Sequence, residues 1–420
     1  MAEWSIAVMA GLVLGYALLA KKFAAANITP PMLSVLAGVI VFSVAEIEVD
    51  TAAIHIIAEL TLVIVLFHDA STVKLGKLKH DPGIAVRLLA IGFPIAIVGT
   101  YLLTWELLPT LGVAGAWLLA AAVTPTDAGL GAATMLNPVV PMRVRRALNV
   151  ESGLNDGLAT PLVLLALSAL VAEEGATEPS VLRVGFVPVA LAVILAVAGG
   201  LSTAWLMDRS RERRFSGHRG RAIATLVLPL MLSGLANVIG ANTFITAFVG
   251  GLVFGAASRT VEAEPEASEL LEVAADLLGF VVWFFAGGLV LAVFADGIRW
   301  QWLVVAVASL TALRIVPVWI ALAGTGFRWQ TMAFLGWFGP RGLATIVFGL
   351  LALEELGEQS PVMSDLSGVI ALTVLLSVFA HGISAAPLSV WYGRWVGRTH
   401  PPIEDVESVE PMPSRGRHSY

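Results

Sequence analysis

The chain has 420 residues, of which 57% are hydrophobic and 13% are charged, and its formal net charge at pH 7 is −6. Soluble domains carry about 25% charged residues, so this composition excludes a soluble enzyme and predicts a polytopic membrane protein. The absence of cysteine excludes disulfides and thiolate metal sites.

Apolar segments bounded by charged residues, proline or glycine predict thirteen membrane-spanning helices and an all-α membrane protein. In chain order they cover residues 4–20, 32–47, 53–70, 85–105, 112–136, 146–171, 184–207, 221–239, 241–257, 275–295, 300–323, 329–352 and 366–390. The first span follows the acidic Glu3 and has no basic residue before it, so we expect it to be retained rather than cleaved as a signal peptide.

Two segments outside the spans are polar. Arg259–Asp276 is an acidic loop in which we expect an interfacial helix. Residues 399–420, which follow a transmembrane domain of residues 1–398, form a short tail for which we expect no fixed structure. The sequence has no P-loop, no HExxH and no GxGxxG after a strand, so we expect no nucleotide or cofactor. As partners we expect membrane lipid and no nucleic acid.

Lysine and arginine residues are divided unequally between the two sides of the predicted membrane. One side carries 21 of the 25, whereas Arg183 and Arg299 lie on the other side and Arg314 and Arg341 lie within spans. By the positive-inside rule the richer side is cytoplasmic. We therefore predict a multi-pass protein of the plasma membrane with its N-terminus outside and its C-terminus in the cytoplasm. The residues of the richer side are Lys21, Lys22, the four between Lys74 and Arg87, the three between Arg143 and Arg146, the six between Arg209 and Arg221, Arg259, Arg328 and the four between Arg394 and Arg417.

Two predicted spans contain helix-breaking residues at their middle. Pro125 removes a backbone hydrogen bond from the span 112–136 and moves the preceding Thr124 away from helical angles. The sequence Gly339-Pro340-Arg341-Gly342 interrupts the span 329–352 in the same manner. The alternative is that proline and glycine merely kink these helices.

The two interrupted spans run in opposite directions in the predicted topology. This arrangement is typical of inverted-repeat transporters, in which two crossing discontinuous helices form a site at the membrane midplane. We predict a first repeat at residues 1–171, a linker helix at 184–207 and a second repeat at 221–395.

Three carboxylates, Asp127, Glu151 and Asp156, lie within predicted spans. Charges at bilayer depth are costly, so we expect these groups to face a cavity and to handle ions or protons; a salt-bridge network that packs helices is the alternative. A carboxylate held away from water needs a proton or a cation to neutralise it. Because binding one expels the other, the cluster predicts antiport.

Residues four apart share one face of a helix, so Ser152 lies over Asp156. The hydroxyl and carboxylate oxygens of these two residues suit a hard alkali cation such as Na+ or Li+, or alternatively K+. We expect Thr126, through the carbonyl that the break frees, and the Asp127 carboxylate to complete the shell.

Glu151 and Asn155 form the neighbouring ridge of the same helix. Arg314, within the span 300–323, needs a counter-charge, and a pair with Glu151 would satisfy both residues. We expect this pair to be structural or orienting rather than a proton carrier. Arg341 is expected to compensate the negative helix ends at the breaks.

These residues resemble the monovalent cation:proton antiporters, specifically the sodium/proton exchanger branch with an Asn-Asp pair (NhaP-like). The resemblance covers residues 5–395 in order and topology, and the Glu-Ser-x-x-Asn-Asp run is its specific part. Its motifs are Thr126-Asp127, Glu151-Ser152-x-x-Asn155-Asp156, Ala312-Leu313-Arg314 and Gly339-Pro340-Arg341-Gly342.

The resemblance implies an NhaA/NhaP-like fold with core and dimerisation domains, a homodimer, and alternating access by an elevator-like movement. It implies that Asp156 is the main ion- and proton-binding carboxylate, that Asn155 supports Asp127, and that exchange is electroneutral. The family often has Asp-Pro after the threonine, whereas here Pro125 precedes Thr126-Asp127 and Ala128 follows it.

Four further residues have open roles. Asp69 resembles an acidic residue near the family site and is a supporting candidate, with an ordinary helix-end charge as the alternative and Glu59 as a competitor. His68 is a pH sensor or a helix-end histidine. His381 is expected to be a core histidine.

Two other functions remain open. A potassium efflux system of the same superfamily is one, although such proteins usually carry a large nucleotide-binding domain. An intramembrane serine protease using Ser152 and His381 is the other, but it explains neither the carboxylates nor the broken helices.

Overall fold

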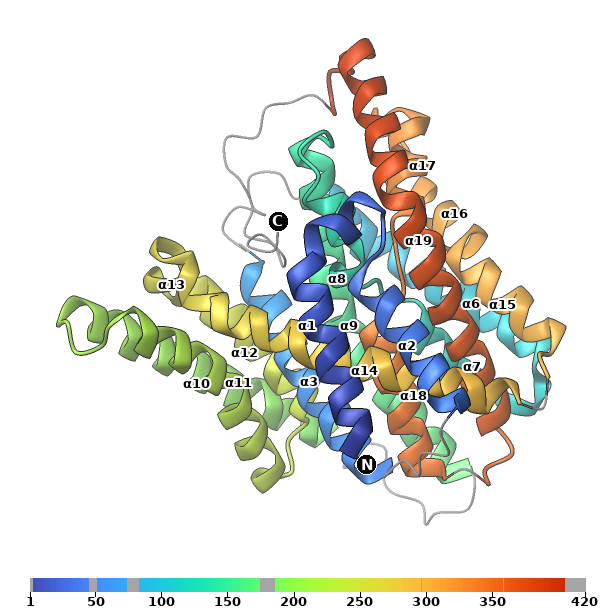
Figure 1. Cartoon of the computed structure of the whole chain (residues 1–420), viewed down its shortest axis with the longest axis horizontal. Coiled ribbons are helices and arrows are strands. Elements are labelled where there is room, and N and C mark those ends of the chain that lie inside the picture. The colour runs from blue at the N-terminus through green and yellow to red at the C-terminus, as the bar shows by residue number, and fades with distance from the viewer. Residues whose placement is uncertain are drawn as a thin grey trace.

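The computed structural model describes residues 3–44, 51–73, 83–173, 186–295, 297–357 and 359–404, whose regular elements are all helices (Figure 1). In chain order these are α1 (Glu3–Ala25), α2 (Pro30–Val44), α3 (Thr51–Thr72), α5 (Gly83–Arg87), the π-helical turn η1 (Leu88–Gly92), α6 (Phe93–Leu107), the 3-10 turn η2 (Pro109–Leu111), α7 (Gly112–Val123), α8 (Ala128–Met135), α9 (Met142–Glu173), α10 (Val187–Glu212), α11 (His218–Ile239), α12 (Thr243–Ala257), α13 (Arg259–Ala263), the 3-10 turn η4 (Pro265–Ser268), α14 (Glu269–Phe294), α15 (Trp300–Leu310), α16 (Ala312–Leu322), α17 (Trp329–Trp337), α18 (Leu343–Leu356) and α19 (Met363–Thr399).

The described helices match the predicted spans. Ten segments are long and apolar enough to cross a bilayer, and Pro30–Val44 and Thr243–Ala257 are shorter apolar helices. The remaining predicted span, 329–352, corresponds to α17 and α18, two short helices on either side of a break. The prediction of an all-helical membrane protein is therefore confirmed.

Most helix ends differ from the predicted ones by a few residues, and α19 continues to Thr399, beyond the predicted end at 390. Two further differences concern the acidic loop and the span 300–323. The acidic loop ends at residue 268, after α13 and η4, because α14 already begins at Glu269. The span 300–323, predicted to be continuous, is interrupted at Thr311, whose φ of −120° and ψ of −93° are not helical. No proline or glycine lies within three residues of Thr311, so the sequence did not mark this interruption.

Several sequence predictions fall on other parts of the chain. Arg183, the basic residues between 74 and 82, and residues 405–420 of the predicted tail lie outside the described residues. The first residues of that tail are described, and they pack on the ends of other helices: the Ile403 carbonyl accepts a hydrogen bond from Arg143, and Glu404 accepts one from the Arg328 backbone.

The helices divide into two bundles by their packing. One, which we call the glycine-packed bundle, contains α1, α2, α3, α10, α11, α12 and α14. The other, the broken-helix bundle, contains α6 to α9 and α15 to α19. In Figure 1, α10 and α11 extend to the left, whereas α15, α16 and α19 lie on the right.

Close backbone contacts hold the glycine-packed bundle together. A Cβ atom at Gly255 of α12 would lie 2.1 Å from the Ser71 carbonyl oxygen of α3, and one at Gly38 of α2 would lie 2.0 Å from the Phe284 carbonyl oxygen of α14. Small residues at such points let membrane helices approach closely, which dispersion forces then stabilise.

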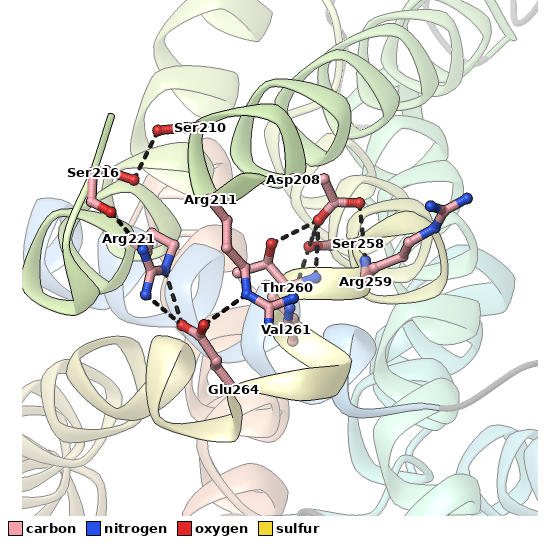
Figure 2. Close-up of polar contacts among 10 residues, drawn as sticks. All are labelled: Asp208, Ser210, Arg211, Ser216, Arg221, Ser258, Arg259, Thr260, Val261 and Glu264. Carbon is pink, nitrogen blue, oxygen red and sulfur yellow. Dashed lines mark hydrogen bonds and ion pairs between the residues drawn. The ribbon is translucent and has the colours of Figure 1, made fainter. Parts of the chain in front are cut away.

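Polar contacts fasten the ends of α10, α11 and α13 to one another (Figure 2). Asp208 accepts hydrogen bonds from the backbone N–H groups of Arg259 and Thr260, at 3.1 and 2.9 Å. Glu264 pairs with Arg211 at 2.7 Å and with Arg221 at 2.6 Å. These groups lie on the predicted cytoplasmic side, where charged side chains remain near water.

Candidate ion-binding site

The first helix break consists of Thr124 to Asp127, between α7 and α8. Pro125 has no N–H, so the α-helical ladder stops there. Asp127 has extended backbone angles (φ −92°, ψ 121°) and is the N-cap of α8, because its Oδ1 atom accepts a hydrogen bond from Leu130 N at 2.9 Å. The predicted break is present.

The second break runs from Phe338 to Gly342, between α17 and α18, and it crosses the first. The Asp127 N–H donates to the Pro340 carbonyl at 2.8 Å. Oδ2 of Asp127 accepts from Leu343 N, the first residue of α18, also at 2.8 Å. One buried carboxylate therefore caps the positive N-terminal ends of two half-helices.

Arg341 stabilises the opposite, negative ends of the interrupted helices. Its guanidinium is buried and donates to the Val123 carbonyl at 2.6 Å, to the Ser309 carbonyl at 2.9 Å and to the Gly339 carbonyl. Val123 is the last residue of α7, and Ser309 lies in the last turn of α15. The arginine thus satisfies carbonyls that the interrupted helices leave without partners, and its charge offsets their negative ends.

The glycines of the second break are required by close approach. A Cβ atom at Gly342 would lie 1.9 Å from Oδ2 of Asp127, and one at Gly339 would lie 2.4 Å from Nε of Arg314. A side chain at Gly342 would push the two breaks apart, and one at Gly339 would displace Arg314.

A chain of hydrogen bonds connects the first break to α9. Nδ2 of Asn155 donates to Oγ1 of Thr126 at 2.7 Å, and the Thr126 and Ser152 hydroxyls are 2.8 Å apart. The resemblance implies that Asn155 supports Asp127. In the structure the Asn155 amide donates instead to Thr126, the residue before Asp127. Oδ1 of Asn155 is buried and has no hydrogen-bond partner among the described atoms.

Asp156 lies on the same helix, one turn after Ser152, and its side chain is 7% exposed. Arg341 interacts electrostatically with both Asp156 and Glu151. The predicted ligands therefore come from two elements: Thr126 and Asp127 from the first break, and Ser152 and Asp156 from one turn of α9.

Glu151 and Arg314 form a buried ion pair with two hydrogen bonds. Nη2 of Arg314 donates to Oε2 of Glu151 at 2.8 Å, and Nη1 donates to Oε1. Both side chains are at most 6% exposed. The structure thus joins the two residues that the sequence analysis paired, and the pair fastens α9 to α16.

Two cavities lie near this cluster. One of about 140 Å³ brings Asp127 together with Tyr16, Thr29 and Asp276. Asp276 is not among the predicted site residues; it lies where the predicted loop 259–276 overlaps the predicted span 275–295. A smaller cavity is lined by Asp69, Thr72, Ala128, Ala132, Met135, Asn149 and Gly153, so the supporting candidate Asp69 faces α8 and α9.

The remaining candidates lie elsewhere. His68 contacts the Asp69 carboxylate at 3.0 Å. His381 is buried and contacts the carbonyls of Ser377 and Trp337, at 3.0 and 2.9 Å. No hydrogen bond between Ser152 and His381 is present in the described part of the chain, so the geometry of a serine protease is not formed there.

Comparisons with known proteins identify a family. The family model described as "Sodium/hydrogen exchanger, transmembrane" matches residues 7–391. A Na(+)/H(+) antiporter of Schizosaccharomyces pombe is 24% identical over 316 residues, which cover 68% of this chain and 67% of that protein. A Na(+)/H(+) antiporter of Saccharomyces cerevisiae is 24% identical over 298 residues, but the match covers only 29% of its length.

The fold has a solved counterpart. The sodium proton antiporter MjNhaP1 from Methanocaldococcus jannaschii superposes with a TM-score of 0.69 over 92% of this chain and 98% of its own, at 19% identity. At that identity the likeness shows the fold, and it confirms the predicted NhaP-like architecture. The matched family comprises transporters, which confirms that the chain is not an enzyme. Because the family match extends over most of the chain, the protein belongs to the sodium/hydrogen exchanger family.

Proposed function

We propose that this protein exchanges Na+ or Li+ for protons across the membrane, with Asp156 as the carboxylate that both ions neutralise in turn. The observation that carries this proposal is the set of buried oxygens on Thr126, Ser152 and Asn155, next to the crossing of two broken helices. On α9, Ser152 lies one turn before Asp156 and Asn155 directly precedes it, and both bond Thr126 of the first break. Carboxylate, hydroxyl and amide oxygens are hard ligands, which alkali cations prefer.

The competition between proton and cation follows from the burial of Asp156. A carboxylate with 7% exposure is stabilised either by a proton or by a cation, and one oxygen pair cannot hold both. Arg341 is bonded to carbonyls, and Glu151 and Arg314 are bonded to each other, so we expect them to set the local potential without taking part in the exchange.

Asp127 contributes in a second way. Each of its oxygens accepts one backbone N–H, so lone pairs remain for a cation. We propose that it holds the two breaks together and serves as a further ligand. Since Asn155 is an amide, Asp156 is the single titrating acid of the pair, which supports an exchange of one cation for one proton.

The remaining elements of the proposal concern assembly and movement. The inverted repeat is supported by matched packing: Gly38 of α2 contacts α14, as Gly251 and Gly255 of α12 contact α3. These helices hold corresponding places in the two predicted repeats. The division into two bundles supports an elevator-like movement of the broken-helix bundle. A homodimer in the plasma membrane, with the N-terminus outside, completes the proposal.

The test is proton flux in vesicles with an imposed pH gradient. Addition of Na+ or Li+ should dissipate the gradient, and Asp156→Asn should abolish the dissipation. Glu264→Gln, which changes a carboxylate far from the breaks, serves as the matched control and should remain active.

The outcome also decides between cations and stoichiometries. A response to K+ but not to Na+ or Li+ would favour the potassium alternative. A rate that changes when the membrane potential is clamped would exclude electroneutral exchange. Full activity of the Asp156→Asn variant would overturn the site assignment.

A further inference from the structure

An ion pair joins the two bundles at a distance from the carboxylate cluster. Nε2 of His55, on α3 of the glycine-packed bundle, lies 2.6 Å from Oε2 of Glu354, on α18 of the broken-helix bundle. The side chains are 17% and 54% exposed. The two groups attract each other as charges when the imidazole is protonated.

The pair lies at the wall of a large apolar cavity between the bundles. This cavity has a volume of about 800 Å³ and is lined by α2, α3, α14 and α18. His55 and Glu354 are the ionisable residues among its described lining; the rest are apolar residues and glycines such as Phe42, Phe285 and Leu350. Apart from this pair, the two bundles face each other across the cavity with apolar surfaces, which form no directional bonds.

The two inter-bundle cavities are stacked along α14. The cavity that contains Asp127 uses residues 276–283 of α14, whereas the large apolar cavity uses residues 282–292. The His55–Glu354 contact therefore lies toward the end of α14, on the side where α3 begins and α18 ends. The Asp127 cavity lies toward the opposite side, with Thr29 at the start of α2.

We propose that His55 and Glu354 form a proton-dependent latch, which holds the bundles together on one side of the membrane while the carboxylate cluster is accessible from the other. This inference rests on the proposed antiport by movement of the bundles. A histidine is charged only when protonated, and its charge changes in the physiological pH range. Acid on the latch side strengthens the pair and retards the bundle movement; alkali weakens the pair and releases it.

The neighbouring charges favour this behaviour. Glu59 lies one turn after His55 on α3, and Glu355 follows Glu354 on α18, so the ionisable neighbours on both elements are carboxylates. The described lining residues of α2 and α14 are not ionisable. A charged imidazole at this position therefore meets only acidic or uncharged groups among these residues.

A cross-linking experiment tests whether the bundles separate at this point. Because the chain contains no cysteine, the double variant His55→Cys/Glu354→Cys carries the only two thiols. A short, reversible bis-methanethiosulfonate should reduce exchange to the level of protein-free liposomes, and a reductant should restore it. The control pair Phe42→Cys/Phe285→Cys lies within the glycine-packed bundle, so it should cross-link without loss of exchange.

A pH experiment tests the charge dependence. In His55→Gln and in Glu354→Gln, exchange at acidic pH on the latch side should rise about twofold to fivefold over the unchanged protein, which is the effect of one partly exposed ion pair. At alkaline pH the rates should coincide. Glu355→Gln, which retains the pair, should shift the profile much less. The effect should appear in only one of right-side-out and everted vesicles when the outer pH is varied.

The outcomes separate the two proposals. If the unchanged protein exchanges no ions, the proposed function fails. If it exchanges ions but remains active when the thiols are fully cross-linked, or if both glutamine variants follow its pH profile, the latch alone is wrong.

Discussion

Two polar clusters of this protein use the same devices in different surroundings. At the helix breaks, Asp127 caps the N-termini of α8 and α18, and Glu151 pairs with Arg314. At the ends of α10, α11 and α13, Asp208 caps the N-terminus of α13, and Glu264 pairs with two arginines (Figure 2). The first cluster is buried between apolar helices, and the second faces the aqueous side.

The difference shows what burial adds to an ion pair. A buried charge that loses its partner has no water to replace it, whereas a partly exposed charge is solvated at once. The buried cluster therefore holds the breaks in one arrangement. The exposed network only fastens helix ends.

The largest expected difference in stability is between variants that neutralise one glutamate in each cluster. Glu151→Gln leaves Arg314 as an uncompensated buried charge and should cost about 3–5 kcal/mol of stability. Glu264→Gln should cost about 0–1 kcal/mol, because its arginines remain hydrated. Thermal unfolding in detergent measures both. Equal losses in the two variants would contradict the role given to burial.

Removing the carboxylates of Asp127 and Asp208 should give two stability losses that differ less. Asp208→Ala removes the acceptor of the first two backbone N–H groups of α13, whose N-cap residue Ser258 remains, and should cost about 1 kcal/mol. Asp127→Ala removes the caps of two half-helices at bilayer depth and should cost about twice that or more, since unsatisfied N–H groups there have no water to bond. Asp127→Asn, which keeps acceptor oxygen, should recover part of the stability. A smaller loss for Asp127→Ala than for Asp208→Ala would show that the crossing is held by other contacts.

The smallest effect concerns pH. Hydrogen bonds from Arg221 hold the pKa of Glu264 below its ordinary value of 4.5, and Arg211 adds to the shift. Because the pKa is lowered in the folded protein, the contribution of Glu264 to stability is present above about pH 4.5 and is lost as the pH falls through the folded-state pKa. Melting temperatures measured between pH 6 and pH 3 should fall less steeply for Glu264→Gln. Parallel curves would show that other carboxylates govern acid unfolding.

Some features of the site were predictable because they follow from local chemistry. Proline without an N–H predicts the break at Pro125, and an arginine within an apolar span demands a carboxylate, which selected Glu151 for Arg314. Other features were not predictable in this way. No proline or glycine marks the interruption at Thr311. Beside it, the Ser309 carbonyl accepts a hydrogen bond from Arg341, which lies 32 residues after Ser309.

By itself, the sequence determined the succession of membrane helices, the positions of two breaks and the residue types of the buried cluster, since hydropathy and proline act locally along the chain. Only the tertiary structure decided which helix ends each charge serves: Asp127 reaches an α18 residue 216 positions later, and Arg341 reaches a carbonyl 218 positions earlier. The physical reason is that a buried charge is stabilised by whichever dipoles are nearest in space, and packing of distant helices brings those dipoles together.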